Sequence, residues 1–160
     1  MDKSLLVEAA KHLRLGSICL FEGNLRRFAD LPEAGGLGQQ TKLGVKKAGL
    51  VRGVAADGAV AVFRVLVDLG VRVINQAVAE GVEPSPLFQI EAVFQLDYEL
   101  TGVLGQAALD EFARFNAVHN VWPFWRQFVF GMANQAGLPC PEVPLTTSLQ
   151  GLENIVVGSV

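Results

Sequence analysis

The clearest pattern in the chain is a strict alternation of apolar and polar positions over residues 87–100. One face carries apolar side chains, and the other carries glutamine and acidic side chains with Val93 as an exception. The apolar positions are Phe88, Ile90, Ala92, Phe94, Leu96, Tyr98 and Leu100. A period of two predicts a long strand with one buried and one solvated face. Such a strand favours an antiparallel sheet, because strands of parallel sheets are usually apolar on both faces.

Three further strands are predicted over 14–31, 41–55 and 59–74. Asp57-Gly58 has the composition of a tight hairpin turn between the last two of them. The arm at 59–74 is almost wholly apolar on one face. The charged side chains of its other face, which should meet solvent or a neighbouring strand, are Arg64, Asp68 and Arg72.

Two stretches outside these strands predict other local structure. Residues 3–13 place Leu5, Leu6 and Ala9 on one side of a short helix. Residues 32–40 contain one proline and three glycines and predict a loop. The glycines do not form a nucleotide-binding loop, because no Gly-Lys-Ser or Gly-Lys-Thr sequence follows them.

The period changes to that of a helix after residue 105. Residues 106–118 place apolar side chains three or four positions apart. Asn120 and Pro123 predict a break and the start of a second helix, which Gly137 and Pro139 end. Four strands followed by two helices predict an α+β fold, a four-stranded antiparallel sheet with both helices packed on one face.

Composition indicates one domain over 1–160 with more apolar material than a single core needs. The 160 residues are 51% hydrophobic and only 18% charged, whereas about 25% charged is average. We expect 1–12 to be an N-terminal helix or arm, and 145–160 to be a loosely specified tail, either an extra strand or loose. The apolar surplus predicts self-association or an apolar surface for a partner.

Charge argues against nucleic acid as a partner, because the net charge is −3 and the pI is about 5.4. Residues 1–50 hold eight Lys/Arg and five Asp/Glu, and 51–160 hold five and eleven. The acidic second half suits a basic partner. We find no signal peptide and no apolar run of membrane-spanning length, so the predicted location is the cytoplasm, without membrane insertion.

No catalytic constellation stands out, so the sequence predicts no enzyme, no cofactor and no metal site. The two cysteines, Cys19 and Cys140, and the two histidines are far apart and lack metal-ligand spacing. Both cysteines are predicted to be buried, unreactive thiols. His119 is interpreted as a histidine at a helix end.

The region 87–139, with the Gly-Leu-Pro-Cys-Pro-Glu-Val-Pro that begins at its end, resembles the C-terminal half of the SecB family of bacterial protein-export chaperones. The residues that carry this resemblance are Asn120, Pro123, Phe124 and Arg126 at a helix start, and Leu138, Pro139 and Pro144 after it. Trp122 and Trp125 resemble the divergent SecB-like members. Arg126 lies near a helix N-terminus, which favours acids, so we expect it to pair with an acidic residue on the sheet.

The resemblance implies an ATP-independent holdase that binds unfolded polypeptides in apolar grooves, for protein export and translocation or for antitoxin protection. It implies unfolded preproteins or an antitoxin as partners, the translocase motor ATPase as a further partner, and a homotetramer built as a dimer of dimers. It also implies that the loop at 32–40 crosses over the sheet beside the client groove. The predicted client-binding residues are Leu37, Phe88, Phe94, Trp122, Trp125 and Phe128. The predicted acidic docking face consists of Glu91, Asp97 and Glu99.

Two other readings stay open. One is a small-ligand-binding or enzymatic α+β domain shaped like a cone, in which the apolar surplus lines a cavity. The other is a structural interaction module that binds no client. For the cavity domain, mutation of His119 or Asp97 should abolish a reaction, and a ligand should raise the melting temperature of a monomer or dimer. Failure to delay the aggregation of a denatured protein identifies the interaction module.

Overall fold

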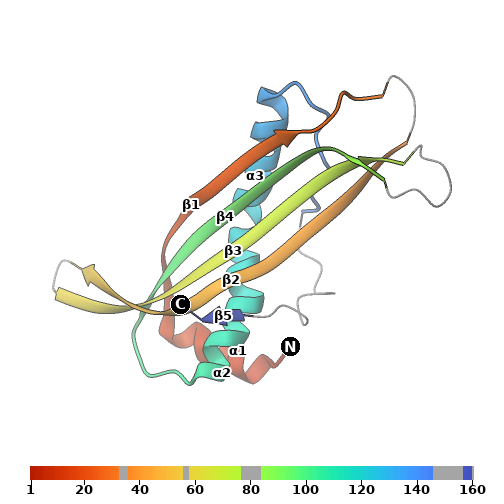
Figure 1. Ribbon diagram of the computed structural model, residues 1–160. Coiled ribbons are helices and arrows are strands. Elements are labelled where there is room, and N and C mark those ends of the chain that lie inside the picture. The colour runs from red at the N-terminus through yellow and green to blue at the C-terminus, as the bar shows by residue number, and fades with distance from the viewer. Residues whose placement is uncertain (33–35, 56–57, 77–83, 146–156, 160) are drawn as a thin grey trace.

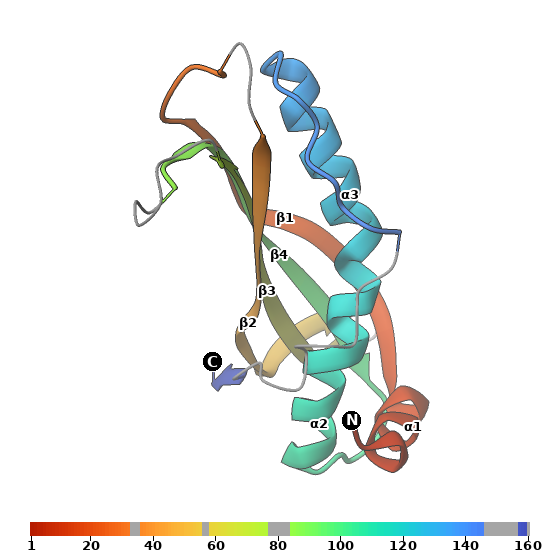
Figure 2. The same ribbon diagram turned by 90° about the vertical axis from the view of Figure 1, so that its right-hand side faces the viewer.

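The structure is a computed structural model that describes residues 1–32, 36–55, 58–76, 84–145 and 157–159. Four long strands and one short strand form one sheet, and the helices lie on one side of it (Figures 1 and 2). The strands are β1 (Leu13–Arg27), β2 (Leu37–Ala55), β3 (Gly58–Asn75), β4 (Pro86–Leu100) and β5 (Val157–Ser159).

The strand order is β1-β4-β3-β2-β5, and the four long strands pair antiparallel. The predicted antiparallel sheet is therefore confirmed for these strands. The tail adds β5 in parallel to the edge of β2, with Val45 opposite Val157 and Ala48 opposite Ser159. The complete sheet is mixed, because the free N–H and C=O groups of an edge strand accept a further strand in either direction.

Strand β2 begins earlier than the apolar pattern indicates. The prediction of a loop over 32–40 is wrong for its last four residues, which pair with β3 from Leu37 opposite Asn75 onward. Gly38, Gln39 and Gln40 have little intrinsic strand signal, and the hydrogen bonds to β3 supply what their side chains lack. Residues 33–35 and the predicted turn residue Asp57 lie outside the described part of the chain.

The core lies between the helices and one face of the sheet (Figure 2). Six alternating side chains of β3 are at most 5% exposed, namely Phe63, Val65, Val67, Leu69, Val71 and Val73. On β4 the corresponding buried side chains are Phe88, Ile90, Ala92, Phe94, Leu96 and Tyr98. The period-two prediction is confirmed, and burial of each large apolar side chain contributes about 1.5–3 kcal/mol.

Helices α2 (Gln106–Phe112) and α3 (Val118–Gln135) are joined directly by a π-helical turn, η1 (Ala113–Ala117). The predicted helix start at Pro123 is wrong, since Pro123 lies inside α3. Its missing N–H leaves the carbonyl of His119 without a helical partner. Both residues are exposed, so water can bind that carbonyl and the helix continues. The buried side chains before and after the π-turn, such as Leu109 and Val121, join the same core.

The predicted N-terminal helix is confirmed as α1 (Lys3–His12), which packs beside α2 at one end of the sheet (Figure 2). The Asp2 carboxylate begins it by accepting hydrogen bonds from the N–H groups of Ser4, at 2.9 Å, and Leu5, at 3.4 Å. The Ser4 hydroxyl also donates to this carboxylate, at 2.7 Å. This bond has the largest effect, and together with the two N–H bonds it lowers the pKa of Asp2. Ala9 is fully buried against the core.

Candidate functional site

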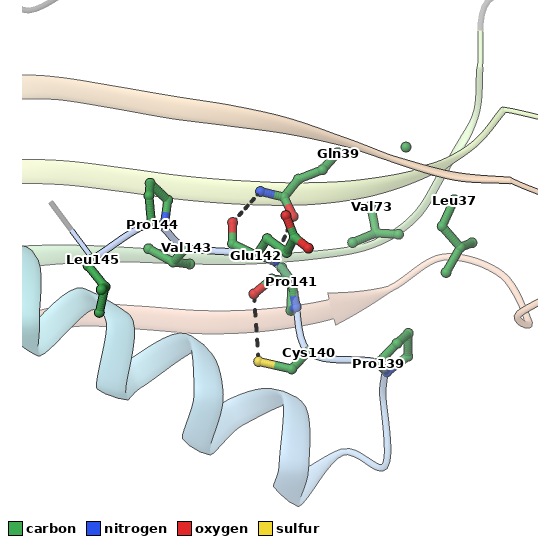
Figure 3. A pocket seen from close by; sticks show the side chains of 11 residues that line it. Leu37, Gln39, Val73, Pro139, Cys140, Pro141, Glu142, Val143, Pro144 and Leu145 are labelled. Atoms are coloured by element: carbon green, nitrogen blue, oxygen red, sulfur yellow. Dashed lines mark hydrogen bonds between the residues drawn. The ribbon is translucent and has the colours of Figure 1, made fainter. Parts of the chain in front are cut away.

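An extended segment returns along α3 after the helix ends (Figures 2 and 3). We call residues 138–145 the strap. Gly137 ends the helix in the left-handed conformation, with φ of 62°. The N–H of Leu138 then donates to the carbonyl of Ala133 at 2.9 Å, which turns the chain back. Pro139 cannot rejoin the helix because it has no N–H.

The strap forms one wall of an open cavity of about 850 Å³ (Figure 3). Leu37 and Val73 line the cavity from the ends of β2 and β3. Leu37 is 44% exposed and Leu145 is 77% exposed, so apolar surface is accessible from solvent here. A cavity of this volume accepts a stretch of extended peptide or a small ligand.

Three side chains, one from β2 and two from α3, hold the strap by hydrogen bonds. Gln39 of β2 donates to the carbonyl of Glu142 at 2.7 Å and accepts from its N–H at 2.9 Å (Figure 3). From α3, Trp122 Nε1 donates to the carbonyl of Pro144 at 2.8 Å. Arg126 Nε donates to the carbonyl of Val143 at 3.1 Å.

The expectation that Arg126 pairs with an acid on the sheet is therefore wrong. Its guanidinium is directed at the strap, which lies beside α3 and offers a main-chain carbonyl. A carbonyl carries the partial negative charge that a guanidinium donor needs, and the hydrogen bond is charge-assisted.

The structure separates the six predicted client-binding residues into two groups. Phe88, Phe94 and Trp125 are at most 4% exposed and belong to the core, so they do not line an accessible surface. The other three are Leu37, which lines the cavity, and the half-buried Trp122 and Phe128. Periodicity assigns a side chain to a face of an element, and it does not show which part of that face another element covers.

Phe128 packs between the buried aromatics and the edge strand. Its ring meets Phe94 edge-to-face and lies stacked on Trp125, with centroids 6.2 Å apart in both pairs. A Cβ atom on Gly23 of β1 would lie 2.7 Å from the Phe128 ring, so glycine allows this close approach. The cluster fixes the part of α3 that carries the strap-binding residues Trp122 and Arg126.

Sequence reasoning missed Gln39, Val73 and the main chain of the strap as parts of the site. Gln39 pairs opposite Val73, whose side chain faces the core, so Gln39 is a polar residue at a core-facing position of β2. That signal becomes visible only when β2 is known to begin at Leu37.

Comparison with solved structures finds a protein with a similar fold. The chain superposes on the Mycobacterium tuberculosis Rv1957 SecB-like chaperone, solved in complex with a ChAD peptide from the Rv1956 HigA1 antitoxin, with a TM-score of 0.72. The match covers 91% of this chain and 99% of that chain, at 14% sequence identity. The fold is SecB-like. No family model matches the sequence, and no curated protein matches it significantly.

Glu91, Asp97 and Glu99 alternate along β4 with its buried side chains and therefore lie on the other face of the sheet. That face carries no helix (Figure 2). Asp97 is held by two hydrogen bonds from Arg64, at 2.8 and 2.7 Å. Lys42 Nζ lies 2.8 Å from Asp68 and 3.8 Å from Glu91. The hydrogen bonds to Asp97 and Asp68 raise the pKa of Arg64 and Lys42, respectively. Asp97 thus has its own cationic partner, whereas Glu91 shares Lys42 with Asp68. Docking of a basic partner on this face stays a prediction.

Asn120, one of the residues that suggested a SecB-like chain, has a structural partner in the core. Its Nδ2 donates to the Tyr98 hydroxyl at 3.0 Å. Phe112 packs edge-to-face on the Tyr98 ring, with centroids 5.0 Å apart. Burial raises the pKa of Tyr98 to about 12, and the hydrogen bond from Asn120 partly opposes this shift.

We expect the folded protein to ionise Tyr98 only near pH 12. Below pH 10 the contribution of the neutral phenol to stability is complete, and it is lost as the pH rises from about 10 to about 12. The full loss is about 2 to 3 kcal/mol. Tyr98 is the only tyrosine in the chain, so tyrosinate absorbance measures it alone. Unfolding in urea should lower the midpoint to about 10, and Tyr98→Phe should abolish the signal. A midpoint near 10 in the native protein contradicts the burial argument.

The expectation of two buried cysteines is wrong, because Cys19 and Cys140 are both exposed free thiols. Cys19 lies on the edge strand β1 opposite Gln95, on the face without helices. Cys140 lies in the strap. Within the described ranges, no group of three metal-ligating side chains comes together, and no helix is long and apolar enough to cross a membrane.

Proposed function

We propose that this protein is an ATP-independent holdase chaperone that binds non-native polypeptides along exposed apolar surface. The observation that carries the proposal is a SecB-like fold that leaves large apolar side chains uncovered. The side chains that are at least 44% exposed on β1, β2, α3 and the neighbouring loops include Leu15, Leu20, Phe21, Phe28, Leu37, Leu50, Phe124, Phe130 and Leu145. Contiguous exposed apolar surface marks an interaction site, and two of these side chains, Leu37 and Leu145, line the same cavity beside the strap.

The cavity beside the strap is the part of this surface that we assign to the client. Its apolar lining and its opening to solvent suit side chains that a folded client would bury. A client segment that buries about 1,000 Å² of apolar surface gains on the order of 25 kcal/mol gross, most of which is offset by ordering and association costs. The net binding is moderate and promiscuous, as a holdase requires.

We further propose a homotetramer that is a dimer of dimers. β1 is 15 residues long and forms one edge of the sheet, where it pairs only with β4 among the described strands. An open edge of this length, with Leu15, Leu20 and Phe21 exposed, is a ready template for pairing with a second copy.

An antitoxin or another non-native polypeptide is the client class we favour over a preprotein delivered to a translocase motor. The structural neighbour was solved with an antitoxin peptide bound. On the face of the sheet without helices, Arg64 pairs with Asp97, and Lys42 is shared between Asp68 and Glu91. These ion pairs reduce the electrostatic support for docking a basic partner there.

The test is size-exclusion chromatography with light scattering, with and without a urea-denatured, slow-folding client and with no nucleotide present. We expect a particle of about four chains that co-elutes with the unfolded client and not with the same client after refolding. It should also delay aggregation of that client. A monomer or dimer that ignores the unfolded chain contradicts the proposal, and ligand screening of the cavity then becomes the next experiment.

A further inference from the structure

The bonds that hold the strap all end on its main chain. Gln39, Trp122 and Arg126 bind the carbonyl groups of three consecutive residues, 142, 143 and 144, and Gln39 also binds one N–H. Side chains of the strap take no part in these four bonds. Groups that bind only main-chain atoms recognise an extended backbone and not a particular sequence.

The three side chains are placed to bind an extended chain from both sides. Trp122 and Arg126 are four residues apart on α3 and therefore project from the same face of the helix. Gln39 projects from β2 on the other side and presents its amide as both donor and acceptor. It thereby pairs with one residue in the way that a neighbouring strand residue does.

The strap offers few main-chain N–H donors at the position between α3 and β2. Prolines 139, 141 and 144 have no N–H group, so the strap offers fewer main-chain donors than an ordinary extended peptide. Leu138 and Pro141 are buried and anchor it, while Glu142 and Leu145 are exposed. A peptide with ordinary N–H groups and apolar side chains can make the same main-chain bonds and also bring apolar side chains into the cavity.

We propose that Gln39, Trp122 and Arg126 form a main-chain clamp for an extended segment of client polypeptide, and that strap residues 142–144 occupy the clamp until a client displaces them. The proposal rests on the proposed holdase function. It adds that the clamp recognises the main chain of the client. Displacement also opens the cavity wall opposite Leu37 and Val73, so that client side chains can enter. Because the strap competes, the apparent client affinity is lower than that of the free clamp.

Two strap variants test the competition, with reduced, carboxymethylated α-lactalbumin as a permanently unfolded client. Glu142→Pro removes the N–H that Gln39 accepts, and Glu142→Ala keeps it. The ratio of the client affinities of the two variants therefore measures the contribution of the hydrogen bond from the Glu142 N–H to Gln39. We expect the proline variant to bind about threefold to tenfold more tightly than the alanine variant, since a net hydrogen bond to the strap is lost. Equal affinities, or weaker binding by the proline variant, overturn the displacement.

A clamp variant tests recognition of the client itself. Gln39→Met, made in the Glu142→Pro background, removes both bonds from a bound client but only one from the strap, which has already lost its N–H bond. It should therefore weaken client binding several-fold relative to Glu142→Pro alone. The matched control is Gln40→Met, whose side chain contacts Arg72 away from the strap. A loss that is equal in the two variants contradicts a specific role for Gln39.

Hydrogen exchange gives a direct measure of displacement. Only five strap residues carry an exchangeable main-chain N–H, namely Leu138, Cys140, Glu142, Val143 and Leu145. We expect deuterium uptake by this segment to rise when the carboxymethylated client binds to the full-length protein. Unchanged or reduced uptake with the client bound shows that the strap stays in place. That result overturns the proposal that the client displaces the strap from the clamp. If the wild-type protein binds no unfolded client, the proposed function fails first.

Discussion

Replacing Trp125 by alanine is expected to lower the free energy of unfolding by about 3–5 kcal/mol. Trp125 is 3% exposed and lies under Phe128, on which its ring is stacked. Removing the indole leaves a cavity in the centre of the α3–sheet interface, and the rigid neighbours cannot collapse to fill it. The measurement is urea unfolding followed by circular dichroism at one fixed protein concentration, because oligomerisation shifts apparent stability.

The matched control is Phe130→Ala on the same helix. Phe130 is 60% exposed, so its loss should change the free energy of unfolding by less than about 0.5 kcal/mol. The comparison also decides the role of Trp125. A variant that unfolds like the wild type but binds the unfolded client more weakly contradicts the core assignment and restores Trp125 as a client-binding residue.

Replacing Glu111 by alanine is expected to cost about 2–3 kcal/mol of stability. Its carboxylate is 11% exposed, accepts a hydrogen bond from the main-chain N–H of Asp2 and lies 3.8 Å from the guanidinium of Arg114. In the described part of the chain, Arg114 Nε is buried without a hydrogen-bond partner, so Glu111 is an important compensating charge for it. The variant leaves that charge poorly compensated and loosens α1 from α2.

A double-mutant cycle with Arg114→Met separates the ion pair from the contact with α1. We expect the double variant to recover most of the loss, because an ion pair replaced by apolar side chains leaves no unpaired charge. The remaining deficit measures the contacts of Glu111 with the N-terminus, which are the hydrogen bond from the N–H of Asp2 and the ion pair at 3.8 Å with the Met1 ammonium. Additive losses contradict the interpretation of Arg114 as the residue that needs Glu111.

The strands that were predicted well are those whose pattern is dictated by burial on one face. The alternation along β4 and the apolar face of β3 follow from the strand period, and a polar substitution there would place an unpaired group in the core. The helix end at Gly137 and Pro139 follows from local backbone chemistry. These features depend only on neighbours in the sequence, so the sequence is sufficient to predict them.

The candidate site was predicted less completely. Leu37 and Trp122 were among the expected residues: Leu37 lines the cavity, and Trp122 of α3 donates a hydrogen bond to the strap. Gln39 was not expected, and Arg126 was expected to bind an acid. Both depend on where the strap lies, and the strap is held by bonds to residues 17 to 103 positions away in sequence. No local pattern encodes such contacts.

The sequence by itself determined which faces of the strands and helices are apolar, where α3 ends, and the strands-then-helices order that produces an α+β fold. Only the tertiary structure decided that α2 continues into α3 through η1 and that α3 runs past Pro123. It also decided that the tail joins β2 as a parallel strand, and that the strap turns back into the space between α3 and the sheet. It also decided that Trp125 is buried while Leu37 is accessible. The reason is that periodicity defines the side of an element that avoids water, whereas coverage of that side depends on long-range packing.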